Sequence, residues 1–157
     1  MDFALEVHNI LIYRGKTLSI AESCTGGLIS HMLTEMSGAS SYLLSSVVAY
    51  SAIAKERILK IDRSLIEKYG TISPEIALEM AKSVSLITNS DYSIATTGNL
   101  GPKAIEGKEL GLLYIALFEK DNMFVKELKL TKDRKQNKND ASMYALKMLY
   151  EHLLKIT

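Results

Sequence analysis

Apolar residues between Phe3 and Ile12 recur at the spacing of one helical face, and Gly15 ends the pattern. A glycine just past the last periodic residue is typical of a helix end. The pattern therefore predicts a helix over residues 3–14. The next stretch, 17–21, is short and apolar, which predicts a buried strand.

Later stretches alternate between the two kinds of pattern. The triplet Ser73-Pro74-Glu75 is a strong helix start, because proline suits the first helical turn. Helices are predicted at 28–37, 52–59, 64–69, 74–88 and 135–156, and strands at 42–50, 92–97, 110–119 and 123–130.

Helices at both ends with strands between them, and no repeat or linker, predict one three-layer α/β/α domain over residues 1–157. The last two strands are expected to form a hairpin that turns at Asp121-Asn122. A hairpin makes the sheet mixed, since its two strands run antiparallel.

Composition excludes several classes of protein. The 19 basic and 18 acidic residues leave a net charge of +1, so the chain has no basic surface for nucleic acid. The amino terminus resembles neither a signal peptide nor a membrane span, which predicts a cytoplasmic protein without membrane contact. The single cysteine, Cys24, and three scattered histidines predict no disulfide, no metal and no cofactor.

The turn 22–27 joins a predicted strand to a predicted helix. Free N–H groups and the positive end of the helix dipole favour an anion there, and glycines let a ligand approach the backbone. Ser23, Thr25, Gly26 and Gly27 are the candidate phosphate ligands. The alternative, that Ser23 or Thr25 only caps the helix, stays equally open. Cys24 is interpreted as a buried packing residue rather than a nucleophile.

A second group combines a loop serine, Ser40 in Gly38-Ala39-Ser40-Ser41, with Tyr50 and Lys55. A serine nucleophile needs a base, and a desolvated lysine serves as one. Judged on these residues alone, a surface Lys55 and a core Tyr50 are the favoured interpretation.

Two further segments are candidate ligand contacts. Thr97 and Gly98 begin a glycine-proline loop at a strand end, where open α/β sheets bind ligands. Asp133 is placed to cap the last helix, and Arg134 follows it as a candidate phosphate ligand. The simpler alternatives are an ordinary loop and a solvated basic face.

Taken together, seven blocks in this order resemble the CinA C-terminal domain family over almost the whole chain. They are Ala21-Glu22-Ser23-Cys24-Thr25-Gly26-Gly27, Gly38-Ala39-Ser40-Ser41, Tyr50-Ser51 with Lys55, Gly70-Thr71-Ile72-Ser73, Thr97-Gly98, Gly101-Pro102 and Asp133-Arg134.

The resemblance implies a nicotinamide-nucleotide amidase, which converts nicotinamide mononucleotide and water to nicotinic acid mononucleotide and ammonia. It implies Ser40 as nucleophile, with Ser41 adjacent and the register open by one, Lys55 as base and Tyr50 as a relay. The substrate phosphate is expected at the helix start after Ser23, with Thr97 and Arg134 as further contacts. Backbone N–H groups of residues 38–41, or of Gly98 and Asn99, are candidate oxyanion donors.

The chain departs from the family at residues 99–104 and at Lys138, where an arginine is expected. Two alternatives therefore remain: a catalytically silent nucleotide-binding module, and an amidase for another small amide. A homodimer is the expected assembly, through apolar residues such as Leu43, Leu44 and Val47.

Overall fold

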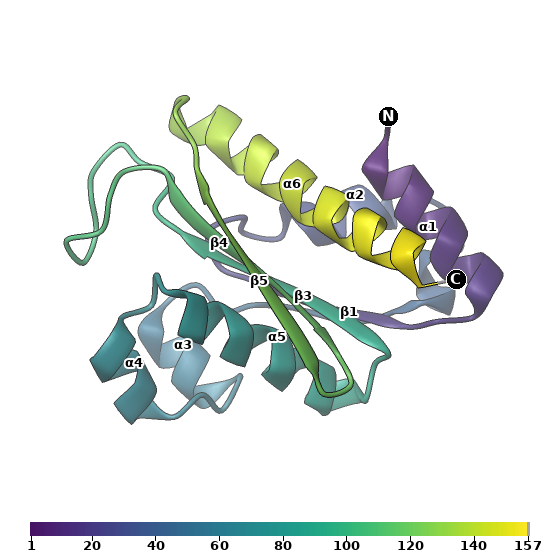
Figure 1. Cartoon of the computed structure of the whole chain (residues 1–157), viewed down its shortest axis with the longest axis horizontal. Helices are drawn as coiled ribbons and strands as arrows, with labels where there is room; N and C mark the ends of the chain where they lie inside the picture. The colour runs from purple at the N-terminus through teal and green to yellow at the C-terminus, as the bar shows by residue number, and fades with distance from the viewer. Residues whose placement is uncertain (157) are drawn as a thin grey trace.

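A five-stranded mixed sheet lies between two layers of helices (Figure 1). The computed structural model describes residues 1–156. The strands stand in the order β2-β1-β3-β4-β5, with β2, β1 and β3 parallel and with β4 and β5 antiparallel to their neighbours. Their bounds are β1 Leu18–Glu22, β2 Leu43–Val48, β3 Tyr92–Gly98, β4 Leu112–Glu119 and β5 Asn122–Lys129. The predicted α/β/α sandwich with a mixed sheet is confirmed.

Within residues 1–156, six α-helices form the two outer layers. One layer contains α1 (Phe3–Arg14), α2 (Leu28–Thr34) and α6 (Arg134–Lys155), and the other contains α3 (Ala52–Arg57), α4 (Arg63–Tyr69) and α5 (Pro74–Thr88) (Figure 1). No helix within residues 1–156 combines the length and the apolar character that crossing a membrane requires.

Successive residues of the central strands face the two helical layers alternately. Ile20 of β1 and Ile94 of β3 belong to the core beneath α1, α2 and α6. The residues that follow them, Ala21 and Ala95, belong to the core beneath α5. Side chains alternate between the faces of a strand, and the small alanines let α5 lie close to the sheet. Because both faces are covered, β1 is buried along its whole length.

The predicted elements agree with the structure except at their ends. The hairpin turns at residues 120–121, one residue earlier than predicted. Strand β2 is shorter than the predicted 42–50, and a short 3₁₀ turn, Ala39–Ser41, precedes it. The predicted cap of α6 is present, since the Gln136 N–H donates to the Asp133 carboxylate at 2.9 Å.

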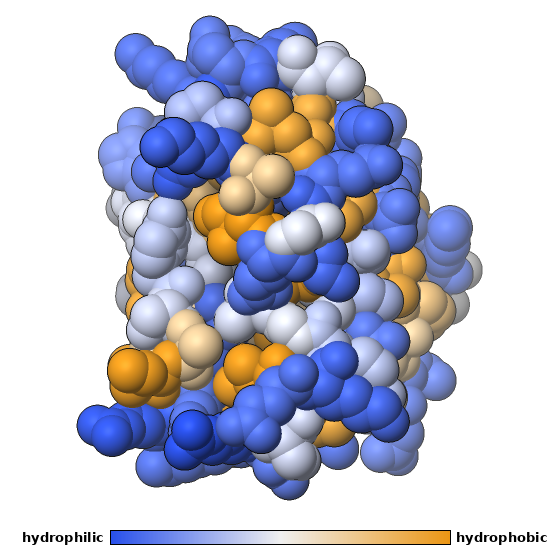
Figure 2. Space-filling view, turned by 90° about the vertical axis from the view of Figure 1, so that its left-hand side faces the viewer, coloured by the Kyte–Doolittle hydropathy of each residue, from blue (hydrophilic) through white to orange (hydrophobic). Residues whose placement is uncertain are grey.

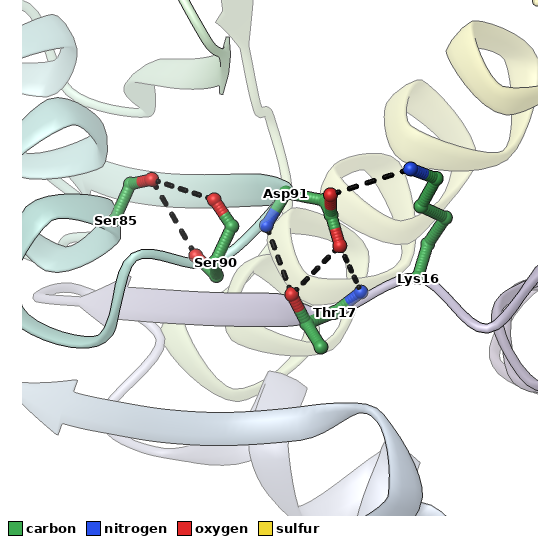
Figure 3. Close-up of polar contacts among 5 residues, drawn as sticks. All are labelled: Lys16, Thr17, Ser85, Ser90 and Asp91. Carbon is green, nitrogen blue, oxygen red and sulfur yellow. Dashed lines mark hydrogen bonds and ion pairs between the residues drawn. The ribbon is translucent and has the colours of Figure 1, made fainter.

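The amino ends of β1 and β3 are tied together by a reciprocal polar contact (Figure 3). Asp91 accepts hydrogen bonds from both the N–H and the hydroxyl of Thr17, each at 2.9 Å, and its own N–H donates to the Thr17 hydroxyl at 2.9 Å. Lys16 adds an ion pair to Asp91 at 3.4 Å. This contact fixes the register of two parallel strands, so their carboxyl ends meet at the opposite edge of the sheet.

Candidate functional site

A cavity of about 330 Å³ opens where β1 and β3 end. It lies on the side of the molecule that bears the loop between β3 and β4, at the left of Figure 1. Seen from that side, the surface shows small patches of apolar residues among polar residues (Figure 2). The lining residues are Ser23, Cys24, Tyr50, Ser51, Ala52, Thr71, Ile72, Thr97, Gly98, Leu100, Ile105, Glu106 and Arg134.

The chemistry of this cavity centres on Ser23 and Lys55. Ser23 directly follows β1, and Lys55 lies on α3, which follows β2. The two strands are parallel neighbours, so both residues reach the same edge of the sheet. Lys55 Nζ lies 2.8 Å from Ser23 Oγ and also donates to the carbonyl oxygens of Ala49 (2.9 Å) and Tyr50 (3.1 Å).

Lys55 is almost fully buried, with 1% of its surface exposed. Burial disfavours the charged ammonium and lowers the pKa of Lys55 from 10.5 to about 8, although the negative charge of Glu106 acts in the opposite direction. At pH 7 a pKa of about 8 leaves roughly one Lys55 side chain in ten neutral. A neutral amine beside a serine hydroxyl is a general base in contact with its nucleophile.

The interpretation of Lys55 and Tyr50 from the residues alone is wrong in both parts. Lys55 is buried, whereas Tyr50 is 57% exposed at the rim of the cavity. The Tyr50 hydroxyl accepts a hydrogen bond from Arg134 Nη2 at 2.8 Å, and Arg134 Nη1 donates to the carbonyl of Gly101 at 2.6 Å. The phenol therefore contacts the arginine, and it is only the backbone carbonyl of Tyr50 that contacts Lys55.

Ser40 lies away from this group, which corrects the expectation that it transfers its proton to Lys55. It is exposed within the 3₁₀ turn Ala39–Ser41, before β2 begins, whereas Tyr50 comes after β2 ends. A six-residue strand separates its two ends by about 20 Å. Ser40 and its neighbour Ser41 thus lie toward the opposite edge of the sheet, and so do the N–H groups of residues 38–41. Ser23 takes the place beside Lys55 that was expected of Ser40.

The start of α2 holds one of the chain's own carboxylates. Glu22 is fully buried and accepts hydrogen bonds from the N–H groups of Ile29 (3.0 Å) and Ser30 (3.1 Å) in the first turn. The hydroxyls of Thr25 (2.6 Å) and Ser30 (2.7 Å) donate to the same carboxylate. These donors are therefore engaged, and a phosphate at this helix start would meet a negative charge, which corrects the expected phosphate site.

The other residues of the turn 22–27 divide between structural and surface positions. Thr25 is fully buried and faces Glu22 and Thr96 rather than the cavity. Gly26 and Gly27 have φ of 58° and 100°, which explains why glycine occupies both positions. A Cβ at Gly26 would lie 3.3 Å from Lys138 Nζ, so this lysine reaches over the turn from α6.

Thr97 and Gly98 line the cavity as expected. The Thr97 hydroxyl donates to the carbonyl of Thr71 at 2.6 Å, which joins β3 to the segment before α5. Gly98 lies so close to β4 that a Cβ would meet the carbonyl oxygen of Leu112 at 2.7 Å. The N–H of Asn99, considered above as an oxyanion donor, is already bonded to that same carbonyl at 2.8 Å.

Cys24 faces the cavity but is not a reactive thiol. Burial raises the pKa of Cys24 to about 12, which keeps it protonated at neutral pH. This agrees with the interpretation of Cys24 as a packing residue. Across residues 1–156, no three histidine, cysteine, aspartate or glutamate side chains gather into a group that would hold a metal ion.

The position of Ser23 beside Lys55 was not predicted, because the motif around Ser23 also resembles a helix cap. A signal was nevertheless present in the sequence: Ser23 follows a predicted strand and Tyr50 ends one, whereas Ser40 precedes one. In a parallel pair of strands, residues that follow the strands share an edge, and a residue that precedes a strand lies at the other edge.

Comparison with known proteins gives one consistent family. The model of the CinA C-terminal domain matches residues 2–153. A competence-damage inducible protein of Thermoanaerobacter sp. (strain X514) is 40% identical over 141 residues, which cover 89% of this chain and 34% of that protein. A CinA-like protein of Syntrophomonas wolfei is 39% identical over 140 residues, covering 88% and 34%. The chain thus spans about a third of the length of these curated relatives.

Solved structures give the same result. The competence damage-inducible protein A of Klebsiella pneumoniae superposes with a TM-score of 0.94 at 28% identity, covering 97% of this chain and 95% of that one. The competence/damage inducible protein of Agrobacterium tumefaciens gives 0.88 at 29% identity, covering 95% and 94%.

Proposed function

Because the chain belongs to the CinA C-terminal domain family, we propose that it is a nicotinamide-nucleotide amidase that uses Ser23 as nucleophile and Lys55 as base. The observation that carries this proposal is the 2.8 Å contact between Lys55 Nζ and Ser23 Oγ at a cavity of about 330 Å³. Serine and lysine recur as a nucleophile and base pair on unrelated folds. The cavity volume falls within the range of small-ligand sites.

Lys55 Nζ donates to Ser23 Oγ and to the carbonyls of Ala49 and Tyr50, which are the three hydrogen bonds of an ammonium, and the Ser23 hydroxyl donates to the Tyr50 carbonyl at 3.3 Å. A neutral amine has two N–H groups and one lone pair. With the two carbonyls keeping the N–H groups, loss of a proton from Lys55 leaves its lone pair facing Ser23 Oγ. In this state Ser23 donates its proton toward Lys55, and its oxygen becomes a stronger nucleophile.

The reaction then proceeds in two halves. Ser23 Oγ attacks the carboxamide carbon as its proton passes to Lys55. Lys55 returns a proton to the amide nitrogen, the carbon–nitrogen bond breaks, and ammonia leaves an ester on Ser23. Water attacks this ester while Lys55 takes its proton, and the carboxylate product leaves as the proton returns to Ser23.

Arg134 is the proposed phosphate ligand. It lines the cavity, and its guanidinium is held by the Tyr50 hydroxyl and the Gly101 carbonyl. Lys138 lies one helical turn further along α6, near Gly26, and adds a second positive charge. Guanidinium groups bind phosphate through paired N–H donors, so the pair Arg134 and Lys138 replaces the start of α2 as the proposed anion site.

The test is ammonia release from nicotinamide mononucleotide by the wild type, Ser23→Ala, Lys55→Met and Ser40→Ala. Both Ser23→Ala and Lys55→Met are expected to lose at least about 10³-fold in kcat, as nucleophile and base variants do in serine hydrolases. Ser40→Ala is the matched control and should keep the wild-type rate, since Ser40 is exposed outside the cavity. A folded wild type that binds the nucleotide without releasing ammonia would favour the silent module. Release from another amide alone would reassign the substrate.

The expected homodimer remains a proposal that the edge strand β2 supports. Leu44 and Val48 of β2 are 44% and 45% exposed, whereas Leu43 and Val47 are half-buried against the core. Apolar side chains exposed on an edge strand favour association with a partner. Light scattering on the purified protein would give the mass, and Leu44→Lys is expected to shift a dimer to monomer.

A further inference from the structure

The loop of residues 99–111, between β3 and β4, borders the cavity from one side to the other. Its first part is held by α6, because Arg134 donates to the Gly101 carbonyl at 2.6 Å and Asn137 Nδ2 donates to the Leu100 carbonyl at 3.1 Å. Its later part reaches the segment between α4 and α5 through Glu106. Leu100, Ile105 and Glu106 of the loop line the cavity.

The segment 70–72 provides both the hydrogen-bond donors and the space for the Glu106 carboxylate. Glu106 accepts hydrogen bonds from the Thr71 N–H at 3.0 and 3.2 Å, from the Thr71 hydroxyl at 2.5 Å and from the Ile72 N–H at 3.5 Å. A Cβ on Gly70 would meet a Glu106 oxygen at 2.5 Å, so the preceding glycine leaves the space that the carboxylate fills. Bonds to a charged acceptor are stronger than those to a neutral one.

We propose that Glu106 is the latch that holds the 99–111 loop closed over the cavity, and that it is a positioning residue for substrate binding. The role in substrate binding rests on the proposed amidase function, whereas the latch itself does not.

The contact between Glu106 and Thr71 connects the 99–111 loop to the segment before α5 and, through that segment, to β3. Thr71, which binds Glu106, also accepts the hydrogen bond from Thr97 at its carbonyl, so one connection runs from the loop through Thr71 to β3. Arg134 holds the same loop at its other end and lies at the proposed phosphate position. The loop is thus fastened on both sides of the cavity.

The position of Glu106 also affects the base. Glu106 lines the cavity, and its negative charge raises the pKa of Lys55. An exposed side chain such as Glu106 contributes little to global stability, so its removal is expected to change the site and leave the fold intact.

The first experiment measures amide hydrogen exchange without substrate, in the wild type, Glu106→Ala and Glu109→Gln. Glu109 is the matched control, because it is an acidic residue of the same loop. It forms an ion pair of 2.7 Å with Lys129, and neither residue lines the cavity. In Glu106→Ala the amides of Thr71, Ile72, Gly101 and residues 103–108 are expected to exchange at least about tenfold faster. In Glu109→Gln the amides of Thr71 and Ile72 should exchange as in the wild type. Unchanged protection in Glu106→Ala would overturn the latch.

The second experiment separates KM from kcat for nicotinamide mononucleotide. Glu106→Ala is expected to raise KM about tenfold and to change kcat less than about threefold, since the nucleophile and base stay in place. Thr71→Val removes the hydroxyl donor and should raise KM in the same direction, and the double variant should add little to either single change. Fully additive effects, or a wild-type KM in Glu106→Ala, would refute the positioning role. A wild type without ammonia release would refute the proposed function, and the exchange measurement would still decide on the latch.

Discussion

The lowered pKa of Lys55 predicts how activity depends on pH. Lys55 acts as a base only when neutral, and its pKa is lowered from 10.5 to about 8 by burial. The neutral fraction therefore rises from roughly 9% at pH 7 to roughly 91% at pH 9. We expect kcat/KM for nicotinamide mononucleotide to rise about tenfold over this interval, with a midpoint near pH 8.

The assay is steady-state ammonia release between pH 7 and pH 10 at constant ionic strength, with blanks without enzyme at each pH. Starting at pH 7 avoids ionisation of the substrate phosphate, whose second pKa is about 6. Glu106→Gln provides an internal check, because removing the negative charge that raises the Lys55 pKa should move the midpoint below that of the wild type.

Two results would refute this reasoning. A rate that stays flat between pH 7 and pH 9 would mean that no group with the lowered pKa of Lys55 controls the reaction. A rate that climbs about 100-fold over the same interval without levelling would mean that the lysine keeps its ordinary pKa of 10.5. In that case burial would not be lowering the pKa of Lys55.

Three further predictions concern binding and stability. Arg134→Met is expected to raise KM for nicotinamide mononucleotide about 10- to 100-fold and to raise KM for the riboside, which has no phosphate, much less; equal losses for both substrates would exclude a phosphate contact. Glu22→Ala removes the acceptor of four hydrogen bonds, two of them buried, and should lower the urea-measured free energy of unfolding by about 3 kcal/mol, whereas an unchanged midpoint would contradict the role of Glu22 at α2. Between pH 8 and 10.5 the unfolded chain binds the Lys55 proton more than the folded chain does, so wild-type stability relative to Lys55→Met should rise with pH by up to about 3 kcal/mol; a fall would reverse the sign of the pKa shift.

The layers of the fold were predictable because each element carries its own local signal. Apolar periodicity together with Gly15 marked the first helix, and the Ser73-Pro74 start marked α5. The hairpin was predicted to within one residue at its turn. These signals lie within single stretches of sequence, so they do not depend on which strands become neighbours in the sheet.

The site was predicted only in part, because its geometry depends on strand order. Lys55 was selected as a candidate base by resemblance, but its burial, which the residues alone did not indicate, follows from the packing of α3 near the ends of β1 and β2. Glu22 looked like an ordinary turn residue, although it supplies the carboxylate that fills the start of α2. Glu106 carried no local signal, since its partner Thr71 lies 35 residues away.

Peptide mass spectrometry on wild-type protein, acid-quenched during turnover of nicotinamide mononucleotide, tests the central claim most directly. The account predicts an ester of nicotinic acid mononucleotide on the peptide that contains Ser23, and none in the Ser23→Ala protein. An adduct on the peptide that contains Ser40, or full turnover by Ser23→Ala, would contradict it.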